Sequence, residues 1–266
     1  MDQNYTISQL FIYPVKGMAG IAIDASFVTQ RGLQFDRRWM LVDENNQFIS
    51  QRSFAILCLF KLDMCNTGFK ISYQHSSLII PFYLDKGQSI QVKIWDDEVT
   101  ALIANAQINE FFSQHLSTSC RLVYMPETTF RLVDKDVVQD DYSVSFADGY
   151  PILIIGQASL NLLNSKLNIS ININRFRPNI VFTGGQAHQE DAWYNFKIEQ
   201  VQLLGVKACA RCQVPGIDQD TAISAKEPLK TLATYRTQKN KINFGQNVIA
   251  KNEGLIRIGD KIEIEN

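Results

Sequence analysis

The segment Lys207-Ala208-Cys209-Ala210-Arg211-Cys212-Gln213-Val214-Pro215-Gly216-Ile217-Asp218 places two thiols, Cys209 and Cys212, three residues apart. One cation lies between them at Arg211, and a second lies just before them at Lys207. Nearby positive charge lowers the pKa of a cysteine and favours the thiolate, which is the nucleophile and the metal ligand. The segment is therefore the first candidate for chemistry in this chain.

The residues on either side of this segment indicate where the thiols lie. Residues 196–206 alternate between apolar and polar side chains, as in a strand with one buried face. Pro215-Gly216 follows too soon after Cys212 for a helix to begin there. We therefore expect both thiols on a loop that leaves a strand, where proteins often carry binding and catalytic groups.

Three interpretations of the thiol pair remain open at this level. A zinc site usually takes four ligands, but the other cysteines, Cys58, Cys65 and Cys120, form no second close pair. A thioredoxin-type dithiol needs a βαβ unit and a helix that begins at the cysteines, and no such helix is expected here. In the third interpretation the two cysteines are structural and unreactive.

Composition limits the class of protein. The chain has 266 residues, of which 45% are hydrophobic, enough for one large domain or two closely joined ones with a real core. A formal net charge of -1 argues against nucleic-acid binding by bulk electrostatics. Five cysteines without a dense framework suggest a reducing compartment, and Met1–Tyr5 lacks the pattern of a signal peptide. No apolar run approaches the roughly 20 residues of a membrane helix, so we expect a cytoplasmic protein that binds neither nucleic acid nor membranes.

Short segments with the alternation of strands follow one another along most of the chain. Turn residues separate them every eight to twelve residues or so, a spacing that indicates a barrel or a sandwich. The segment 48–52 is expected to return antiparallel to 36–43 after a polar turn. The expected strands are Thr6–Val15, Ile21–Gln30, Asp36–Asp43, Phe48–Arg52, Phe69–Tyr73, Ser77–Tyr83, Ser89–Ile94, Val99–Ile103, Pro151–Ile155, Phe196–Val206, Gln246–Ala250 and Leu255–Ile264.

Helices are expected in only three places. Apolar residues recur at helical spacing around residues 106–116 and again around 160–167. A third helix begins at Pro228, because proline is favoured at the first helical position. Pro126–Tyr142 is rich in Thr and Asp and is expected to be a long surface loop or a join between two halves. The predicted fold class is therefore mostly β with a few helices (α+β).

Basic residues gather at strand ends in three places. Lys16 follows the first expected strand, Arg37-Arg38 belongs to the third, and Arg175-x-Arg177 precedes a proline; Arg52 closes the hairpin beside the second cluster. The planar guanidinium group suits phosphate and carboxylate. If these clusters converge, they form a site for an anionic small molecule, and if they do not, they are ordinary surface charge. The three histidines are scattered and both common glycine-rich nucleotide motifs are absent from the sequence, so neither a histidine metal site nor a nucleotide loop is predicted.

Taken in order, motifs along essentially the whole chain resemble the MOSC family, named for the C-terminal domain of the molybdenum-cofactor sulfurase. The resemblance is closest to its two-domain branch, which includes the mitochondrial amidoxime-reducing component and bacterial counterparts. The motifs are Tyr13-Pro14-Val15-Lys16, Asp36-Arg37-Arg38-Trp39, Ser50-Gln51-Arg52, Ser145-Phe146-Ala147-Asp148, Arg175-Phe176-Arg177-Pro178-Asn179-Ile180-Val181, Glu190-Asp191-x-Trp193, Cys209-x-Arg211-Cys212, Asp218-x-Asp220-Thr221, Lys226-x-Pro228-Leu229-x-Thr231-Leu232-x-x-Tyr235-Arg236, Phe244-Gly245-x-Asn247 and Gly259-Asp260.

The resemblance implies an N-terminal β-barrel domain, residues 1–125, packed on a mixed MOSC β-barrel domain, residues 126–266, with a molybdenum–molybdopterin cofactor between them. It implies that Cys212 is the catalytic position and the thiolate ligand of the metal, which fits the preference of thiolates for soft metals. The family is also associated with pyridoxal phosphate binding, for which no residues are implied here. The residues implied to bind the molybdenum cofactor are Lys16, Arg37, Arg52, Asp148, Arg177, Asn179 and Cys212.

Three positions and the end of the chain depart from what the family usually shows. Gly17 stands where relatives often have a small hydroxyl residue, residues 213–216 replace a more apolar run that carries threonine, and Ala222 stands where glycine is common. The chain ends at Asn266 without the ferredoxin-like extension of some bacterial relatives. These differences put substrate preference in doubt more than cofactor binding.

The function implied is a molybdenum-dependent oxidoreductase that reduces N-hydroxylated small molecules. A separate flavin or iron–sulfur protein is expected to supply the electrons, because the chain lacks a nucleotide-binding fingerprint and the cysteine spacing of ferredoxins. The alternatives are a non-catalytic carrier of molybdenum cofactor or sulfur that uses Cys212, and a thiol–disulfide enzyme that uses both cysteines. Neither the physiological substrate nor the oligomeric state follows from the sequence.

Overall fold

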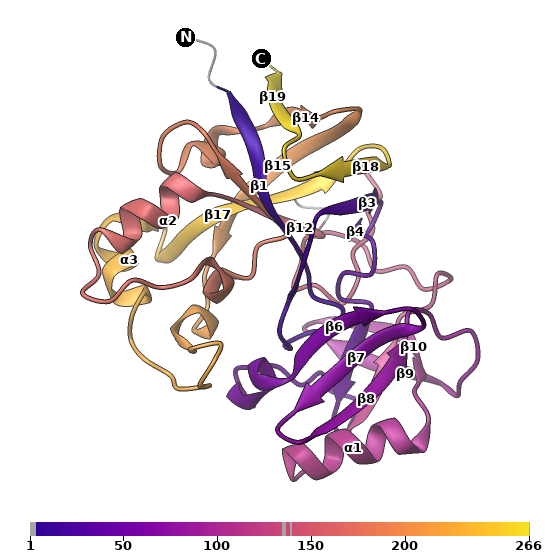
Figure 1. Cartoon of the computed structure of the whole chain (residues 1–266). Coiled ribbons are helices and arrows are strands. Elements are labelled where there is room, and N and C mark those ends of the chain that lie inside the picture. Colours follow the sequence, from indigo (N-terminus) through magenta and orange to yellow (C-terminus); the bar gives the residue numbers. More distant parts are fainter. Residues whose placement is uncertain (1–3, 135–136, 139, 266) are drawn as a thin grey trace.

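Seven strands close into a barrel in the part of the chain that the computed structural model describes, residues 4–134, 137–138 and 140–265 (Figure 1). The sheet runs β12-β13-β1-β19-β14-β15-β17 and returns to β12, which pairs in parallel with β13 and antiparallel with β17. The barrel strands are β1 (Tyr5–Ile12), β12 (Ile152–Gly156), β13 (Ile180–Thr183), β14 (Asn195–Ile198), β15 (Val201–Ala210), β17 (Lys241–Ala250) and β19 (Lys261–Glu265).

The central strand β12 shows why the barrel needs a helical layer outside it. Successive side chains of a strand point to opposite faces. Ile152 and Ile154 pack in the main core, whereas Leu153 and Ile155 pack in a second cluster with apolar residues of two helices. A strand buried on both faces is a nearly continuous apolar run, as this one is. The helices of this layer are α2 (Gln157–Asn164) and α3 (Leu229–Arg236).

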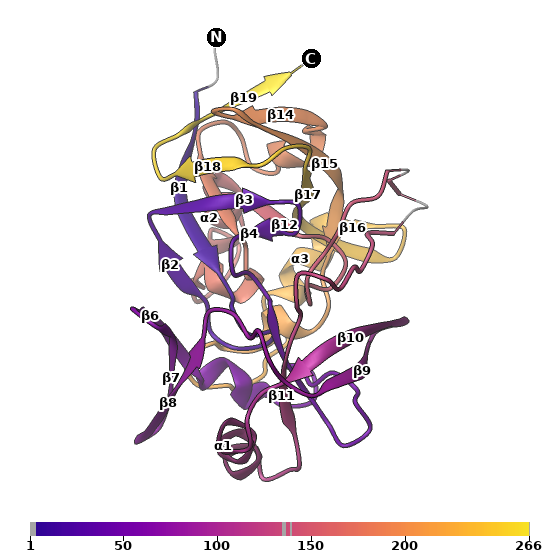
Figure 2. The same ribbon diagram turned by 90° about the vertical axis from the view of Figure 1, so that its right-hand side faces the viewer.

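The N-terminal part adds two smaller sheets and one helix below the barrel, and these form an open half-barrel (Figure 2). One sheet has the order β5-β11-β10-β9 and the other β6-β7-β8. The helix α1 (Ala106–Leu116) buries Ile108, Phe112 and Leu116, and Asn105 caps it by accepting a hydrogen bond from the Ile108 amide. The strands are β5 (Trp39–Val42), β6 (Lys61–Cys65), β7 (Gly68–Tyr73), β8 (Ser76–Pro81), β9 (Ser89–Ile94), β10 (Asp97–Ile103) and β11 (Arg121–Tyr124).

Short elements tie the two parts together. The first strand, β1, lies between β13 and β19 of the barrel, and β3 pairs with β18 near the C-terminus. The early residues therefore complete sheets of the later ones; the division at residue 125 stays a prediction. The remaining elements are β2 (Ile21–Ile23), β3 (Ala25–Thr29), β4 (Gly32–Leu33), β16 (Thr237–Gln238), β18 (Gly254–Arg257), and the 3-10 turns η1 (Ala55–Leu59), η2 (Ile173–Phe176), η3 (Gln189–Ala192) and η4 (Val214–Gly216).

The predicted fold class, mostly β with a few helices, is confirmed. The predicted strand at residues 196–206 is wrong in one respect, because it is the hairpin of β14 and β15, with Glu199 at positive φ in its turn. The expected strands at 21–30 and 255–264 are likewise each divided in two. Alternation continues through such tight turns, so it does not reveal the break. Segment 48–52 pairs with β5 only through an isolated bridge between Val42 and Phe48.

Two expectations fall partly or wholly outside the described residues. The segment 126–142, predicted as a loop or join, contains residues 135, 136 and 139, which are not described, and its described part has no regular helix or strand. The chain ends discussed above, residues 1–3 and 266, are also not described. Within the described residues, no helix is long and apolar enough to cross a membrane.

Candidate functional site

One pocket, where the barrel meets the N-terminal part, brings together all seven residues predicted for the site. It encloses about 140 Å³ and is lined from both sides. The predicted residues that line it are Lys16, Arg37, Arg52, Asp148, Arg177, Asn179 and Cys212. The convergence of residues so far apart in the sequence makes this the candidate site; what each of them binds stays a prediction.

The two thiols occupy different positions in this pocket. Cys212 lies beyond the end of β15 and is exposed, as the sequence predicts. Cys209 lies within β15, so its expected place on the loop is wrong, because pairing with β17 continues to Ala210 across a bulge. The Cys209 sulfur accepts a hydrogen bond of 3.0 Å from Nη1 of Arg211.

Arg211, between the thiols, is held against the wall of the pocket. Its Nη2 donates to the carbonyl of Phe176 at 2.8 Å, and its guanidinium lies 5.4 Å from the centre of that ring. Its Nε is buried and has no hydrogen-bond partner among the described residues. A buried donor without a partner is costly. This N–H group is therefore free to donate a hydrogen bond to a molecule bound in the pocket.

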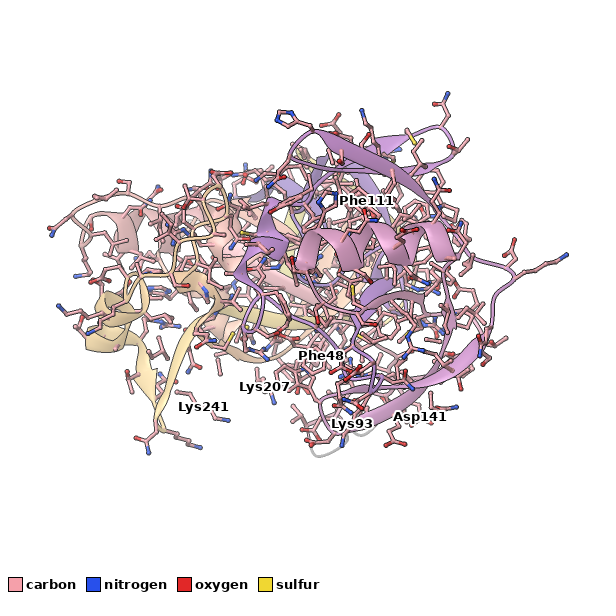
Figure 3. The ribbon with its side chains drawn as sticks, turned by 90° about the horizontal axis from the view of Figure 1, so that it is seen from below. Phe48, Lys93, Phe111, Asp141, Lys207 and Lys241 are labelled. Atoms are coloured by element: carbon pink, nitrogen blue, oxygen red, sulfur yellow. The ribbon has the colours of Figure 1, made fainter. Side chains whose placement is uncertain are left out.

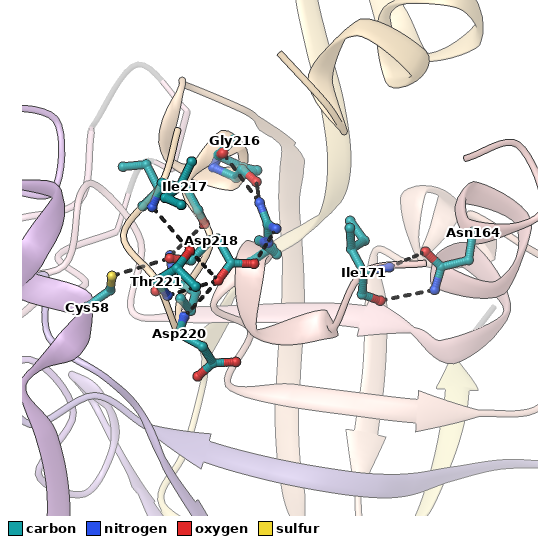
Figure 4. A network of polar contacts seen from close by, with 12 residues as sticks. Cys58, Asn164, Ile171, Gly216, Ile217, Asp218, Asp220 and Thr221 are labelled. Carbon is teal, nitrogen blue, oxygen red and sulfur yellow. Dashed lines mark hydrogen bonds and ion pairs between the residues drawn. The ribbon is translucent and has the colours of Figure 1, made fainter. Parts of the chain in front are cut away.

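The loop after Cys212 is held by an ion pair at its base (Figure 4). Nη2 of Arg175 lies 2.7 Å from Asp218, while its Nη1 donates to the carbonyls of Pro215 and Gly216. The other carboxylate oxygen of Asp218 accepts from the amides of Asp220 and Thr221. Burial alone would raise the pKa of Asp218, but these hydrogen bonds lower it below its usual value. Arg175 thus positions the loop.

Two predicted arginines lie close to the ring of one buried tyrosine, Tyr13. The guanidinium of Arg37 lies 4.5 Å, and that of Arg177 4.2 Å, from the centre of the Tyr13 ring. Both arginines have positive φ, an uncommon conformation for a residue with a side chain. Arg37 also pairs with the buried carboxylate of Asp36. Burial lowers the pKa of Arg177 to about 10, which leaves it charged at neutral pH.

Asn179, which lines the pocket, also connects two strands through its amide. Its Oδ1 accepts from the amide of Leu153 at 3.1 Å and from Nη1 of Arg37 at 3.2 Å, while its Nδ2 donates to the carbonyl of Phe11 at 3.2 Å. The side chain therefore ties β1 to β12 and fixes the guanidinium of Arg37. Its observed contacts make it a positioning residue of the pocket.

Lys16, Asp148 and Arg52 form the opposite side. Nζ of Lys16 lies 2.5 Å from Oδ1 of Asp148, and Nη2 of Arg52 lies 3.6 Å from Oδ2. Lys16 is 6% exposed, and burial lowers its pKa to about 8 although Asp148 opposes that change. Burial would raise the pKa of Asp148, but the charges of Lys16 and Arg52 outweigh it and hold it well below its usual value. Asp148 is therefore ionised at neutral pH.

Further lining residues were not predicted as site residues. Tyr150 lies under Nζ of Lys207, at 5.0 Å from its ring centre, and its hydroxyl is buried without a partner among the described residues. Gln51 and Asn247 also line the pocket. Gln51 and Asn247 belong to quoted motifs, which is the signal that could have found them; Tyr150 follows Asp148 closely but carries no such signal. Figure 3 shows Lys207 and Phe48 labelled on the underside of the molecule.

The pocket fits an anionic cofactor that brings most of its own metal ligands. Within the described residues, no group of three or more His, Cys, Asp or Glu side chains could hold a metal ion. One exposed thiol, Cys212, shares the pocket with Lys16, Arg37, Arg52 and Arg177. Guanidinium and ammonium groups make strong charge-assisted hydrogen bonds to phosphate. Nε of Arg211, which has no hydrogen-bond partner in the described part of the chain, is a further donor in the same wall.

Comparison with known proteins gives matches along nearly the whole chain. The model of the "MOSC N-terminal beta barrel domain" matches residues 4–119, and that of the "MOSC domain" matches residues 141–263. The chain is 31% identical to mitochondrial amidoxime-reducing component 1 of Mus musculus, over 98% of this chain and 83% of that protein. The human protein of the same name is 29% identical with the same coverage. A molybdenum cofactor sulfurase of Oryza sativa subsp. japonica is 26% identical over 90% of this chain but only 32% of its own length.

Proposed function

Since the chain belongs to the MOSC family, and joins a MOSC N-terminal beta barrel domain to a MOSC domain, we propose that it binds a molybdenum cofactor and reduces N-hydroxylated compounds. The observation that carries this proposal is the pocket, where an exposed thiol and four cationic side chains converge. The name of the amidoxime-reducing relatives supports the reaction, and that of the sulfurase supports the cofactor.

Each side of the pocket has a role in this proposal. Cys212 supplies a thiolate to the metal, and the bound metal supplies the two-electron chemistry. Lys16, Arg37, Arg52 and Arg177 hold the anionic part of the cofactor by charge-assisted hydrogen bonds. Two of these groups are held in place before the cofactor arrives, because the guanidinium of Arg37 is already bonded to Asn179 and that of Arg177 to the carbonyl of Met18.

The reaction requires electrons from outside the chain. Conversion of an N–OH group to N–H with release of water takes two electrons and two protons. We propose that a separate flavin or iron–sulfur protein supplies the electrons at the mouth of the pocket. The location of the protein and the identity of this donor stay predictions.

A carrier of molybdenum cofactor is the second candidate. The similarity to the sulfurases supports it, and so does the exposure of Cys212, which is open to a partner as well as to a substrate. A carrier needs the same cationic pocket but no turnover.

Analysis of the purified protein for molybdenum and pterin, followed by an activity assay, separates these candidates. We expect bound cofactor, turnover of a hydroxylated amidine with an artificial electron donor, and no turnover with NADH or NADPH alone. Addition of a reductase fraction from the source cell should restore turnover with NADH. Cofactor without turnover under any donor would favour the carrier, and brisk turnover by the pure protein with NADH alone would contradict the need for a separate donor.

A further inference from the structure

Charge is distributed unevenly around the mouth of the pocket, although the chain as a whole is nearly neutral, with a formal net charge of -1. Residues 200–217 and 228–252, which hold β15, α3, β16 and β17, contain no Asp or Glu. The basic residues of these two stretches are Lys207, Arg211, Lys230, Arg236, Lys239, Lys241 and Lys251. The part of the barrel that borders the pocket therefore carries an excess of positive charge.

One of these cations, Lys241, lies beside the exposed thiol. The amide of Arg211 donates to the carbonyl of Ile242 at 2.7 Å, just beyond the point where the pairing of β15 with β17 ends. In an antiparallel pair the residue after one partner faces the residue before the other. The register that continues from this hydrogen bond therefore sets Lys241 beside Cys212.

Two further lysines lie near Lys241. Nζ of Lys207 lies 5.0 Å from the centre of the ring of Tyr150, which lines the pocket. Lys239 belongs to the two-residue turn between β16 and β17, in which both Lys239 and Asn240 have positive φ. We call Lys207, Lys239 and Lys241 the lysine cluster. Figure 3 shows Lys207 and Lys241 along the same border of the molecule.

The charges of the lysine cluster are exposed and unpaired. None of its three lysines has an ion-pair partner within the part of the chain that the structure describes, whereas Arg236, in the same stretch, pairs with Asp191 at 2.5 Å. The N-terminal side of the mouth is mixed in charge. There the guanidinium of Arg52 lies 4.2 Å from the centre of the Trp95 ring, and the next residue, Asp96, is exposed. The excess of positive charge is therefore confined to the barrel side.

We propose that the lysine cluster is the docking surface for the electron donor, and that the donor is a redox protein with an acidic face around its own cofactor; this rests on the proposed function above. Exposed cations without acidic neighbours on β15, β16 or β17 attract an acidic surface and repel a basic one. Because Lys241 lies beside Cys212, a protein that covers the cluster also covers the mouth of the pocket. A nucleic acid or an anionic membrane would meet the same charges, but neither supplies electrons.

The exposure of the cluster determines the kind of effect to expect. Complementary charges on exposed surfaces act mainly on the rate of association, which they raise by about 10–10³-fold, and salt screens them. The Debye length is about 10 Å at an ionic strength of about 0.1 M and about 3 Å at about 1 M. The contribution of the cluster should therefore be clear at the lower ionic strength and lost at the higher one.

Reversal of two charges of the cluster tests the proposal without turnover. The probe is an acidic [2Fe–2S] ferredoxin, and its dissociation constant is measured in the oxidised form. The double variant Lys207→Glu with Lys241→Glu should bind the ferredoxin about tenfold more weakly than the wild type at about 0.1 M ionic strength, the lower end of electrostatic steering. Lys70→Glu, repeated with a second exposed lysine at Lys86→Glu, is the matched control, because both residues lie in the N-terminal part and outside the pocket. The control should bind the ferredoxin as the wild type does.

The outcomes distinguish this inference from the proposed function. Absence of ferredoxin binding by the wild type, equal weakening in the control, or a difference that persists at about 1 M salt would overturn the docking surface. Binding of phosphatidylserine vesicles or of DNA in place of ferredoxin, lost in the double variant, would assign the cluster to a membrane or a nucleic acid instead.

Activity of the loaded protein gives the second measurement. With reduced ferredoxin as donor, kcat/KM should fall in the double variant by the same factor as binding. With reduced methyl viologen, a small donor that needs no docking surface, the double variant should turn over at least as fast as the wild type. Loaded wild-type protein that shows no turnover with methyl viologen would overturn the proposed reduction, whereas the binding measurements would still decide whether the cluster docks an acidic protein.

Discussion

The two walls of the pocket are built by different interactions. The barrel wall, which we define as Arg177, Asn179, Cys209, Arg211 and Cys212, is held mainly by hydrogen bonds to main-chain carbonyls and amides. The N-terminal wall, which we define as Lys16, Arg37 and Arg52, is held mainly by ion pairs with Asp36 and Asp148. Loss of one partner from a buried ion pair leaves an uncompensated charge, whereas most single hydrogen bonds contribute only about 1 kcal/mol. Substitutions in the barrel wall should therefore change mainly the activity. Substitutions in the N-terminal wall should change both the activity and the free energy of unfolding.

The largest effect is expected within the barrel wall, between its two thiols. Cys212→Ala should abolish activity and change the spectrum of the metal, because the proposed thiolate ligand is lost. Cys209→Ala should retain most of the activity and leave the spectrum of the metal largely unchanged. Cys209 lies in β15, and its sulfur accepts a hydrogen bond from Arg211. Activity and absorption spectra of the two variants, measured side by side, check this prediction.

Equal loss of activity from both changes would favour the dithiol interpretation instead. The free energy of unfolding of the two variants is the control. Cys212 is exposed, so its replacement should leave stability nearly unchanged. A Cys212→Ala protein that loses activity because it unfolds would give no support to the ligand role.

The next effect tests the N-terminal wall. Arg37→Ala leaves the carboxylate of Asp36, which is 1% exposed, without its ion-pair partner. We expect a loss of stability on the order of 3–5 kcal/mol at the upper end and a lower molybdenum and pterin content. Arg52→Ala is the matched control, since its pair with Asp148 is longer, at 3.6 Å, and its partner is mostly exposed. Arg52→Ala should lower the free energy of unfolding by no more than about 1 kcal/mol.

Unfolding by denaturant measures the stability of both arginine variants, and analysis for molybdenum and pterin measures their cofactor content. Unchanged molybdopterin content in Arg37→Ala would count against this site. Equal loss of stability in both variants would contradict the distinction between the buried and the exposed ion pair.

The sequence predicts the β-rich fold and the membership of the pocket, but not the arrangement inside it. Alternating residues indicate strands because one face of each is buried, and ordered motifs indicate which residues converge. The separation of β14 from β15 escapes this reasoning because a tight turn keeps the alternation. The placement of Cys209 in β15 depends on how far β17 continues beside it, which is a property of the partner strand.

Contacts between distant residues are the other part that sequence reasoning misses. Lys16 and Asp148 are 132 residues apart, and neither residue type alone indicates an ion pair or the direction in which its pKa moves. The role of Asn179 in binding cofactor stays a prediction, whereas the way in which its amide joins strands is seen only in the structure. Such roles depend on which donors and acceptors remain free after folding, and this is visible only in the structure.

The smallest effect is expected at Gly17, beside Lys16 in the N-terminal wall. Gly17 has φ +86°, and a Cβ there would lie 3.1 Å from Cδ1 of Leu57. Gly17→Ser should therefore lower the free energy of unfolding by about 1–2 kcal/mol, the cost of a left-handed conformation for a residue with a side chain. Gly149→Ser is the control on the other side of the pocket, because no atom lies within 4 Å of its added Cβ and its φ is not positive; its stability should not change. If Gly17→Ser is as stable as the wild type and holds more cofactor, the serine hydroxyl supplies a hydrogen bond that this chain lacks, and the backbone at Gly17 is more adaptable than its conformation indicates.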